Sequence, residues 1–269
     1  MQLQRHCILV LFFAALVLLP PVAAAEPRET AELDAVIRQY RAEGPEITLP
    51  EFERLQGLYE RNGDRFNEAR AEHFIGECHW RLGNYKRSRT YLEKSLEDSQ
   101  ELRHRLAEGK TLNVLGLLEW DLGNYDQAIA WFEQASAIGR ETGDARLAGS
   151  TMNNLSLVYD ELGDYATSLK QYHRALELYE GADFPRGEGD TLGNIGGTYL
   201  LLGRYQEALS YYQRALAISI NLDSKPSMSL DHGNLALCYL GLGRLDEALE
   251  HIDRALALAK ETGMRKEEA

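Results

Sequence analysis

Four side chains that can bind a metal or transfer protons lie close together in the sequence: His73, Glu77, Cys78 and His79. On a helix, His73 and Glu77 would share one face because they are four residues apart, whereas Cys78 and His79 would point away from it. Two ligands form at most a weak metal site, because a structural zinc site takes four. The remaining serine, histidine and aspartate residues are scattered, without a strained turn that would expose a nucleophile. We therefore expect no resident metal and no catalysis, and we interpret the chain as a non-enzyme.

Glycine is dense in one segment, which contains Gly187, Gly189, Gly193, Gly196 and Gly197. The sequence Gly187-x-Gly189 suggests part of a phosphate-binding loop, but such a loop follows a β-strand within a βαβ unit. The pattern on both sides is helical, so we expect neither a nucleotide nor any other cofactor. Each interior glycine weakens a helix by about 1 kcal/mol relative to alanine. This segment is therefore expected to form the softest helix of the chain.

A constant period of 40 residues organises these segments, because the dipeptide Leu-Gly begins at residues 82, 122, 162, 202 and 242. Five blocks align without a gap, at 63–102, 103–142, 143–182, 183–222 and 223–262. A fixed spacing of this kind marks one supersecondary unit repeated in tandem.

Each block contains two amphipathic helical patterns separated by the Leu-Gly turn. In the third block, Leu155, Tyr159 and Leu162 lie on one face of a first helix, and Gly163 suits the turn that follows. The second helix carries two small residues seven positions apart with a bulky residue between them, which allows close approach of helix axes. The earlier small position holds Ser88, Ala128, Ser168, Ala208 and Ala248, the later one Ser95, Ala135, Ala175, Ala215 and Ala255, and the bulky one Leu92, Phe132, Tyr172, Tyr212 and Ile252. A single pair cannot bury such faces, so the pairs must stack.

These blocks resemble the tetratricopeptide repeat family, in which Leu-Gly-x-x-Tyr on a first helix precedes the small–bulky–small pattern on a second. Block four has Ile195-Gly196-x-x-Tyr199, and block five has Leu235-Ala236-x-x-Tyr239. The blocks are longer than the common repeat of about 34 residues, and are similar in length to those of kinesin light chains and Rap-type peptide sensors. The tyrosine is replaced by His79 and Glu119 in the first two blocks. The resemblance implies an all-α fold, an α-solenoid of stacked helix–turn–helix repeats forming a right-handed superhelix.

In such a solenoid the first helices line a concave groove, and a helical-wheel count selects the positions opposite the packing face. The resulting candidates for a peptide-binding groove are Arg70, Phe74, Lys110, Asn154, Leu157, Asn194, Leu201, Asn234 and Leu237. The three asparagines share one position in successive blocks, and their amides can donate to and accept from a peptide backbone. The three leucines would be apolar on a face that an inert solenoid keeps polar. The alternative interpretation is that the asparagines serve packing between neighbouring helices.

Residues 1–25 have the features of a cleaved signal peptide. Arg5 and His6 precede an apolar run from Ile8 to Leu19, and Ala23-Ala24-Ala25 offers a cleavage site. The run is short for a membrane span, although an uncleaved anchor is the alternative. We expect cleavage after Ala25 and an extracytoplasmic location, either periplasmic or secreted. Cys7 precedes the apolar run, which is the wrong place for acylation of a lipoprotein.

The segments that flank the five blocks are predicted to be helical. In residues 26–62, the spacing predicts one helix over Thr30–Arg41 and a second over Glu51–Arg61, which together would form a degenerate capping unit. Residues 263–269 read as the start of a further helix or as a frayed end. The second possibility would leave the array without a full polar cap.

Cys78 and Cys238 are four whole periods apart. Because packed helices lie roughly 8–10 Å apart, stacking would separate these cysteines far beyond the distance of about 7 Å that a disulfide allows. We expect both to be free thiols that are buried as small apolar residues.

The chain has 29 basic and 42 acidic residues and a net charge of −13. This balance argues against nucleic acid and anionic membrane lipid as partners, because both select basic surfaces. Ordinary solubility is the simpler explanation of the charge.

The sequence thus favours an exported protein–protein interaction scaffold that binds a partner protein or an extended peptide in its groove. The alternative is that the repeats are the N-terminal sensor of a larger signalling or protease protein with a downstream effector domain. Kinase, cyclase and CHAT-type effectors follow exported repeats of this kind, and this comparison rests on analogy between families.

Overall fold

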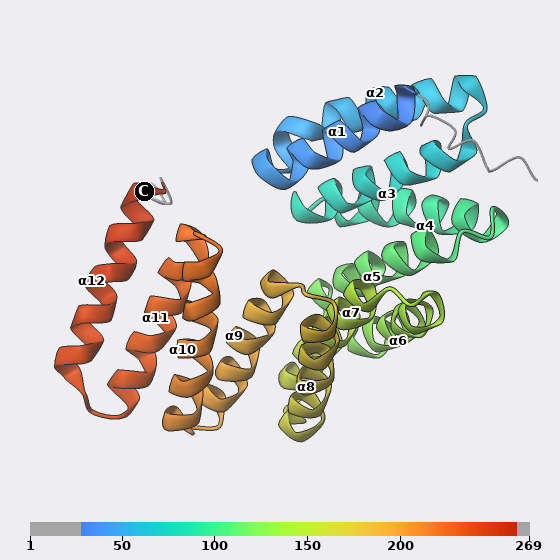
Figure 1. Cartoon of the computed structure of the whole chain (residues 1–269). Coiled ribbons are helices and arrows are strands. Elements are labelled where there is room, and N and C mark those ends of the chain that lie inside the picture. Colours follow the sequence, from blue (N-terminus) through green and yellow to red (C-terminus); the bar gives the residue numbers. More distant parts are fainter. Residues whose placement is uncertain (1–27, 263–269) are drawn as a thin grey trace, which may run out of the picture.

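The computed structural model describes residues 28–262, and this part of the chain forms twelve α-helices and no β-strand (Figure 1). The predicted signal segment 1–25 and the final segment 263–269 lie outside the described residues. The helices are α1 (Arg28–Glu43), α2 (Pro45–Asn62), α3 (Arg65–Arg81), α4 (Tyr85–Glu101), α5 (Arg105–Asp121), α6 (Tyr125–Thr142), α7 (Ala145–Glu161), α8 (Tyr165–Gly181), α9 (Pro185–Leu201), α10 (Tyr205–Asn221), α11 (Lys225–Gly241) and α12 (Leu245–Glu261).

The helices pack in chain order and form an arc that runs from α1 and α2 at one end to α12 at the other (Figure 1). Each helix packs against the helices before and after it. The odd-numbered helices also contact the next odd-numbered helix, whereas no even-numbered helix within residues 28–262 contacts the next even-numbered one. The odd-numbered helices therefore lie on the inner side of the arc. The expected all-α solenoid is confirmed.

The Leu-Gly pairs end the first helix of each pair, as the period predicts. The glycines adopt positive φ angles, which only glycine tolerates without strain: Gly83 73°, Gly123 75°, Gly163 76°, Gly203 69° and Gly243 73°. In the first repeat, the amide of Gly83 donates to the carbonyl of Trp80 and that of Asn84 to the carbonyl of His79. These bonds satisfy carbonyl groups that the helix end leaves free.

Small residues of the inner helices make room for the bulky residues of the outer ones. A Cβ atom added at Gly116 would lie 2.5 Å from the ring of Phe132, and one added at Gly76 would lie 2.6 Å from Leu92. Phe132 and Leu92 are fully buried. The helix pairs therefore pack at a distance that permits no side chain at these glycines.

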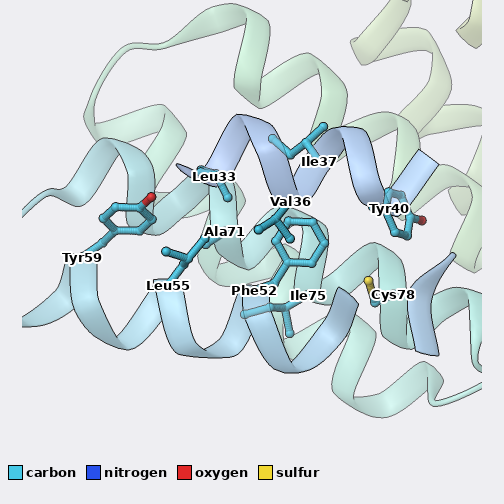
Figure 2. Packing of buried hydrophobic residues seen from close by; sticks show 10 residues of the cluster. All are labelled: Leu33, Val36, Ile37, Tyr40, Phe52, Leu55, Tyr59, Ala71, Ile75 and Cys78. Carbon is cyan, nitrogen blue, oxygen red and sulfur yellow. The ribbon is translucent and has the colours of Figure 1, made fainter. Parts of the chain in front are cut away.

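The first two helices close one end of the arc with their own apolar core. Leu33, Val36 and Ile37 of α1 meet Phe52 and Leu55 of α2, and the cluster continues onto α3 (Figure 2). The sequence pattern had placed the start of the second helix at Glu51, but α2 begins at Pro45. Gly44, with φ of 89°, lets the chain reverse directly after α1, and a proline at the first helical position forfeits no helix hydrogen bond.

The two cysteines of the described residues are free and buried, as expected. Both are fully inaccessible, and burial raises the pKa of the Cys238 thiol to about 11. A thiol with so high a pKa is protonated near neutral pH and reacts slowly. Cys78 and Cys238 therefore act as small apolar residues of the core.

The face of α12 on which a further repeat would stack exposes three leucines, Leu245 at 62%, Leu249 at 60% and Leu256 at 53%. The equivalent residues of α10, Tyr205, Leu209 and Leu216, are at least partly covered. Leu209 and Leu216 belong to the cluster that α10 forms with α11. The α12 leucines are exposed because no described helix stacks on them. None of the helices between Arg28 and Glu261 is long and apolar enough to cross a membrane.

Candidate functional site

The inner side of the arc carries two separate hollows. The first, of about 410 Å³, is bordered mainly by α1, α3 and α5, and we name it the basic hollow. The second, of about 920 Å³, is bordered by α7 to α11, and we name it the C-terminal groove. Both volumes fall in or near the usual range for ligand sites.

The basic hollow gathers four cations around aromatic walls. Arg38, Arg41, Arg70 and Lys110 border it, together with Phe66 and Phe74, and its only carboxylate, Asp34, accepts a 2.5 Å bond from Arg70. Burial lowers the pKa of Lys110, Asp144 acts in the opposite direction, and the nearby Arg70 and Arg41 lower it further. The hollow is thus a positive surface on a protein of negative net charge, and it suits an anionic or aromatic group.

His73 borders the basic hollow as a neutral side chain. Burial lowers its pKa to about 4, with contributions from Lys110 and Arg70, and its Nδ1 lies 3.1 Å from the hydroxyl of Thr111. Its Nε2 is 3.8 Å from a carboxylate oxygen of Glu77, whereas Cys78 and His79 are buried elsewhere. Across residues 28–262, no group of three or more histidine, cysteine, aspartate or glutamate side chains is placed to hold a metal ion.

Two of the three aligned asparagines join neighbouring repeats. The Nδ2 atom of Asn154 donates a 3.0 Å hydrogen bond to Oδ1 of Asn113, and Asn194 donates an equivalent 3.0 Å bond to Oδ1 of Asn153. Both donors are half-buried. The packing interpretation of these two asparagines therefore has direct geometric support.

The C-terminal groove combines exposed leucines with carboxylates. Leu201 is 65% exposed and Leu230 is 66% exposed, while Leu157 is half-buried at the edge of the groove. One cation, Arg186, borders the groove. Four carboxylates border it as well: Asp160, Glu161, Asp190 and Asp231. Burial raises the pKa values of Asp160, Asp190 and Asp231. Burial disfavours the charged form of these carboxylates, so a cation entering the groove would stabilise their ionised state.

Asp160 has a structural role within this wall. Its Oδ2 atom accepts a 2.8 Å bond from Thr198 of the next repeat and a 3.2 Å bond from the hydroxyl of the buried Tyr172. Asp160 thus ties α7 to α8 and α9. Asp231 also joins two repeats, because its Oδ2 atom accepts a 2.6 Å bond from the Ser219 hydroxyl of the preceding repeat.

The structure distributes the candidate residues from the sequence over three places. Arg70, Phe74 and Lys110 border the basic hollow. Leu157, Asn194, Leu201 and Asn234 border the C-terminal groove. Asn154 and Leu237 border neither. Asn154 bonds to Asn113, and Leu237 is 50% exposed on α11.

Helical-wheel reasoning missed Asp160 and Asp231, which lie one step to the side of the selected positions. The 40-residue alignment contained a signal for Asp231. The same position holds Thr111, Thr151 and Thr191 in the preceding repeats, all of them buried, and a carboxylate in the last. The contribution of Arg38 and Arg41 to the basic hollow was also missed, because it depends on how α1 packs beside α3.

Solved structures similar to this chain are repeat proteins with low sequence identity. BtubC (BKLC) from P. vanneervenii has a TM-score of 0.67 and 20% identity over 91% of this chain and 96% of its own. NprR in complex with its cognate peptide NprX has a TM-score of 0.65 and 22% identity, over 87% and 68%. A signal transduction ATPase with a tetratricopeptide repeat sensor from Pyrococcus horikoshii has a TM-score of 0.71 and 16% identity, over 87% and 36%.

At these identities the structural likeness establishes the fold alone, and no curated protein matches the sequence. The tetratricopeptide repeat family model matches residues 67–141, 107–181, 147–221 and 187–261. These overlapping matches run through well over half of the chain. The chain therefore belongs to the tetratricopeptide repeat family.

Proposed function

We propose that this protein is a non-catalytic scaffold that binds an extended peptide, or an unstructured segment of a partner protein, on its inner face. The observation that carries the proposal is the C-terminal groove, which Leu201 of α9 and Leu230 of α11 border while about two-thirds exposed. Burying a leucine side chain contributes about 1.5–3 kcal/mol. A ligand that covers both leucines thus gains affinity without any change in the fold.

The form of the groove favours an extended ligand over a compact one. It runs across three successive inner helices, α7, α9 and α11, and the polar groups along it, Asn194 and Asn234, recur one per repeat. An extended peptide presents its backbone groups at regular intervals, so it matches a surface that repeats. The similar NprR structure holds a peptide, which supports the proposal by analogy.

We further propose that the scaffold acts outside the cytoplasm, after removal of residues 1–25. The basis is the apolar run from Ile8 to Leu19 followed by three alanines. The net charge of −13 supports protein or peptide partners over nucleic acid and anionic lipid. Mass spectrometry of the protein from its native extracytoplasmic fraction tests the export proposal, and an intact Met1 in a cytoplasmic fraction would contradict it.

The binding proposal is tested by affinity capture with a protein that begins at Glu26. The bait is compared with a double variant, Leu201→Asp and Leu230→Asp, which places charges in the apolar walls of the groove. Ile220→Asp is the matched control, because Ile220 is 53% exposed but does not border the groove. We expect ligands that the wild type and the control retain and that the double variant loses.

Equal capture by all three baits would contradict the binding site. Equal melting temperatures of the three proteins are needed to exclude a difference in folding. Mass spectrometry of the retained material then identifies the ligand as a peptide or as a protein.

A second candidate function is that of a sensor segment within a larger protein, favoured by the exposed leucines of α12. Leu245, Leu249 and Leu256 present a face whose equivalent on α10 packs against α11. A further stacked segment that leads to an effector would cover it. Sequencing the transcript downstream of the Ala269 codon tests this candidate, which requires an open reading frame that continues.

A further inference from the structure

One position of the inner helices forms hydrogen bonds between repeats. Its side chain bonds to a residue 38 or 41 positions later, or to both, on the next inner helix. Asn113 accepts from Asn154, Asn153 accepts from Thr191 and Asn194, and His73 bonds to Thr111. The residue in this position therefore joins each of the first three repeats to its successor.

The pattern is broken at α9, where Gly193 occupies this position. A Cβ atom added at Gly193 would meet no atom within 4 Å, in contrast to Gly116 and Gly196 on the packing side. Packing thus gives no reason for a glycine here, although it weakens the helix by about 1 kcal/mol relative to alanine. The missing side chain leaves an open slot in the wall of the C-terminal groove between α9 and α11.

The offsets of 38 and 41 residues lead from Gly193 to Asp231 and Asn234, so a side chain at position 193 would engage these two residues. Both border the groove. The Asn234 amide has no hydrogen-bond partner among the described residues, whereas the Asn154 and Asn194 amides have one each. Asp231 is only 6% exposed, and its Oδ2 atom accepts a 2.6 Å bond from the Ser219 hydroxyl. A donor and a carboxylate thus face the slot that elsewhere an asparagine fills.

The charges around the slot are one-sided. Asp190 lies near enough to Asp231 to disfavour its ionisation, and Asp160 and Glu161 border the same groove. Arg186 is the one basic residue on its border, and its charge offsets part of the effect of burial on Asp190. A positively charged side chain is therefore the complement of this wall, and Leu201 and Leu230 accept the apolar residues beside it.

We propose that the slot at Gly193 receives the backbone of an extended peptide that carries lysine or arginine next to apolar residues. The peptide takes the place of the missing asparagine: its carbonyl accepts from Nδ2 of Asn234, and its cationic side chain meets Asp190 and Asp231. The bare backbone of α9 permits this close approach. This inference rests on the proposed function and names the class of ligand for the same groove.

The test restores the missing side chain. Gly193→Asn supplies the group that Asn113 and Asn153 provide in earlier repeats, and Gly233→Asn makes the same change one repeat later. A Cβ atom at Gly233 also meets nothing within 4 Å, and Gly233 does not border the groove. The probes are fluorescent octapeptides in which leucine alternates with lysine, or with glutamate, and binding is followed by fluorescence polarisation.

We expect the lysine peptide to bind the wild type and Gly233→Asn alike. It should bind Gly193→Asn at least about tenfold more weakly, because the hydrogen bond between the peptide carbonyl and the Asn234 amide is lost. The glutamate peptide should bind none of them. Asp231→Asn, which keeps an acceptor for Ser219, should weaken binding of the lysine peptide and reduce its dependence on salt.

Undiminished binding to folded Gly193→Asn, or equal binding of the two peptides, would overturn this inference. Such a result is distinct from failure of the proposed function. If the captured ligand still depends on Leu201 and Leu230 but not on Gly193, the groove binds a ligand and the assignment of the slot is wrong. If it depends on neither, the proposed function itself is wrong.

Discussion

Asn194 donates a hydrogen bond of 3.0 Å to Asn153, the residue 41 positions earlier, across the boundary between two repeats. Asn234 holds the same position one repeat later and has no such partner among the described residues, because Gly193, 41 positions earlier, carries no side chain. One position of the repeat therefore serves two purposes. It holds repeats together where a partner exists, and it presents a free amide to the groove where the partner is missing.

This difference predicts opposite effects of one substitution at two equivalent positions. Asn194→Ala should lower the free energy of unfolding by about 1 kcal/mol, because it removes a hydrogen bond between repeats. Asn234→Ala should leave unfolding unchanged and weaken ligand binding by about 1–3 kcal/mol, the cost of an unpaired peptide carbonyl. Urea denaturation and titration of the captured ligand measure both quantities. Equal effects of the two variants on stability would contradict the assigned roles.

Tyr172 is predicted to be the costliest aromatic residue to truncate in the third repeat. It is fully buried beside Ala175, and its hydroxyl bonds to Asp160. Tyr172→Ala should destabilise by roughly 3–5 kcal/mol through the cavity that it leaves, and Tyr172→Phe by about 1 kcal/mol, because Thr198 still donates to Asp160.

Enlarging a small residue at the same helix contact should also be unfavourable. Ala175 and Ala215 are 0% and 1% exposed, so replacement of either by leucine should cost about 1–3 kcal/mol through overpacking. Thermal midpoints that do not move in either variant would refute the close packing of the helix pairs.

The turns between repeats contain a site of backbone strain. Arg103, Asp183 and Asp223 adopt φ angles of 56°, 48° and 49° where Gly63 and Gly143 hold equivalent positions. A left-handed conformation costs about 1–2 kcal/mol for a residue with a Cβ atom, and short polar side chains such as aspartate tolerate it better than arginine. Arg103→Gly should therefore raise the free energy of unfolding by about 1 kcal/mol. Gly143→Ala, the reverse change at an equivalent turn, should lower it, and a calorimetric scan of both variants tests the pair.

We expect a histidine pair to make the last repeat sensitive to acid. The Nδ1 atoms of His232 and His251 lie 2.9 Å apart, so that one ring donates and the other accepts while both are neutral. Burial lowers the pKa of both residues, and Arg254 lowers them further, whereas Glu250 acts in the opposite direction on His251. The unfolded chain then binds more protons than the folded one below a pH of about 6.5, so stability is lost as the pH falls through that value.

His251→Phe keeps a ring beside Tyr239 but removes one titrating group. The melting temperature of this variant should fall less steeply between neutral and mildly acidic pH than that of the wild type. Parallel curves for the two proteins would show that the pair does not titrate in this range.

The period of the sequence was sufficient to predict the solenoid. Leu82-Gly83 and its four copies fix where each inner helix ends, and the small residues facing Phe132 and Tyr212 fix how close the helices pack. These features repeat, so a single sequence displays each of them five times. The length of α2 was not predictable in this way, because Pro45–Asn62 lies outside the repeated pattern and its start depends on the reversal at Gly44.

The site was predictable only in part, because its key feature is the missing side chain at Gly193. A helical wheel identifies outward-facing residues such as Leu201 and Asn234, but it treats Gly193 as an ordinary weak position. The meaning of Gly193 depends on the bonds that Asn113 and Asn153 make across repeat boundaries. Likewise, the contribution of Arg38 and Arg41 to the basic hollow depends on α1 packing beside α3, which the alignment of the repeats does not contain.

The central claim is that ligands bind to the inner face of the arc, and hydrogen–deuterium exchange of the protein with and without its captured ligand tests it most directly. The account predicts added protection in the inner helices α7, α9 and α11, greatest around Gly193, with little change in the outer surfaces of α6 and α12. Protection confined to α12 or to other outer helices, with the inner helices unaffected, would contradict the account.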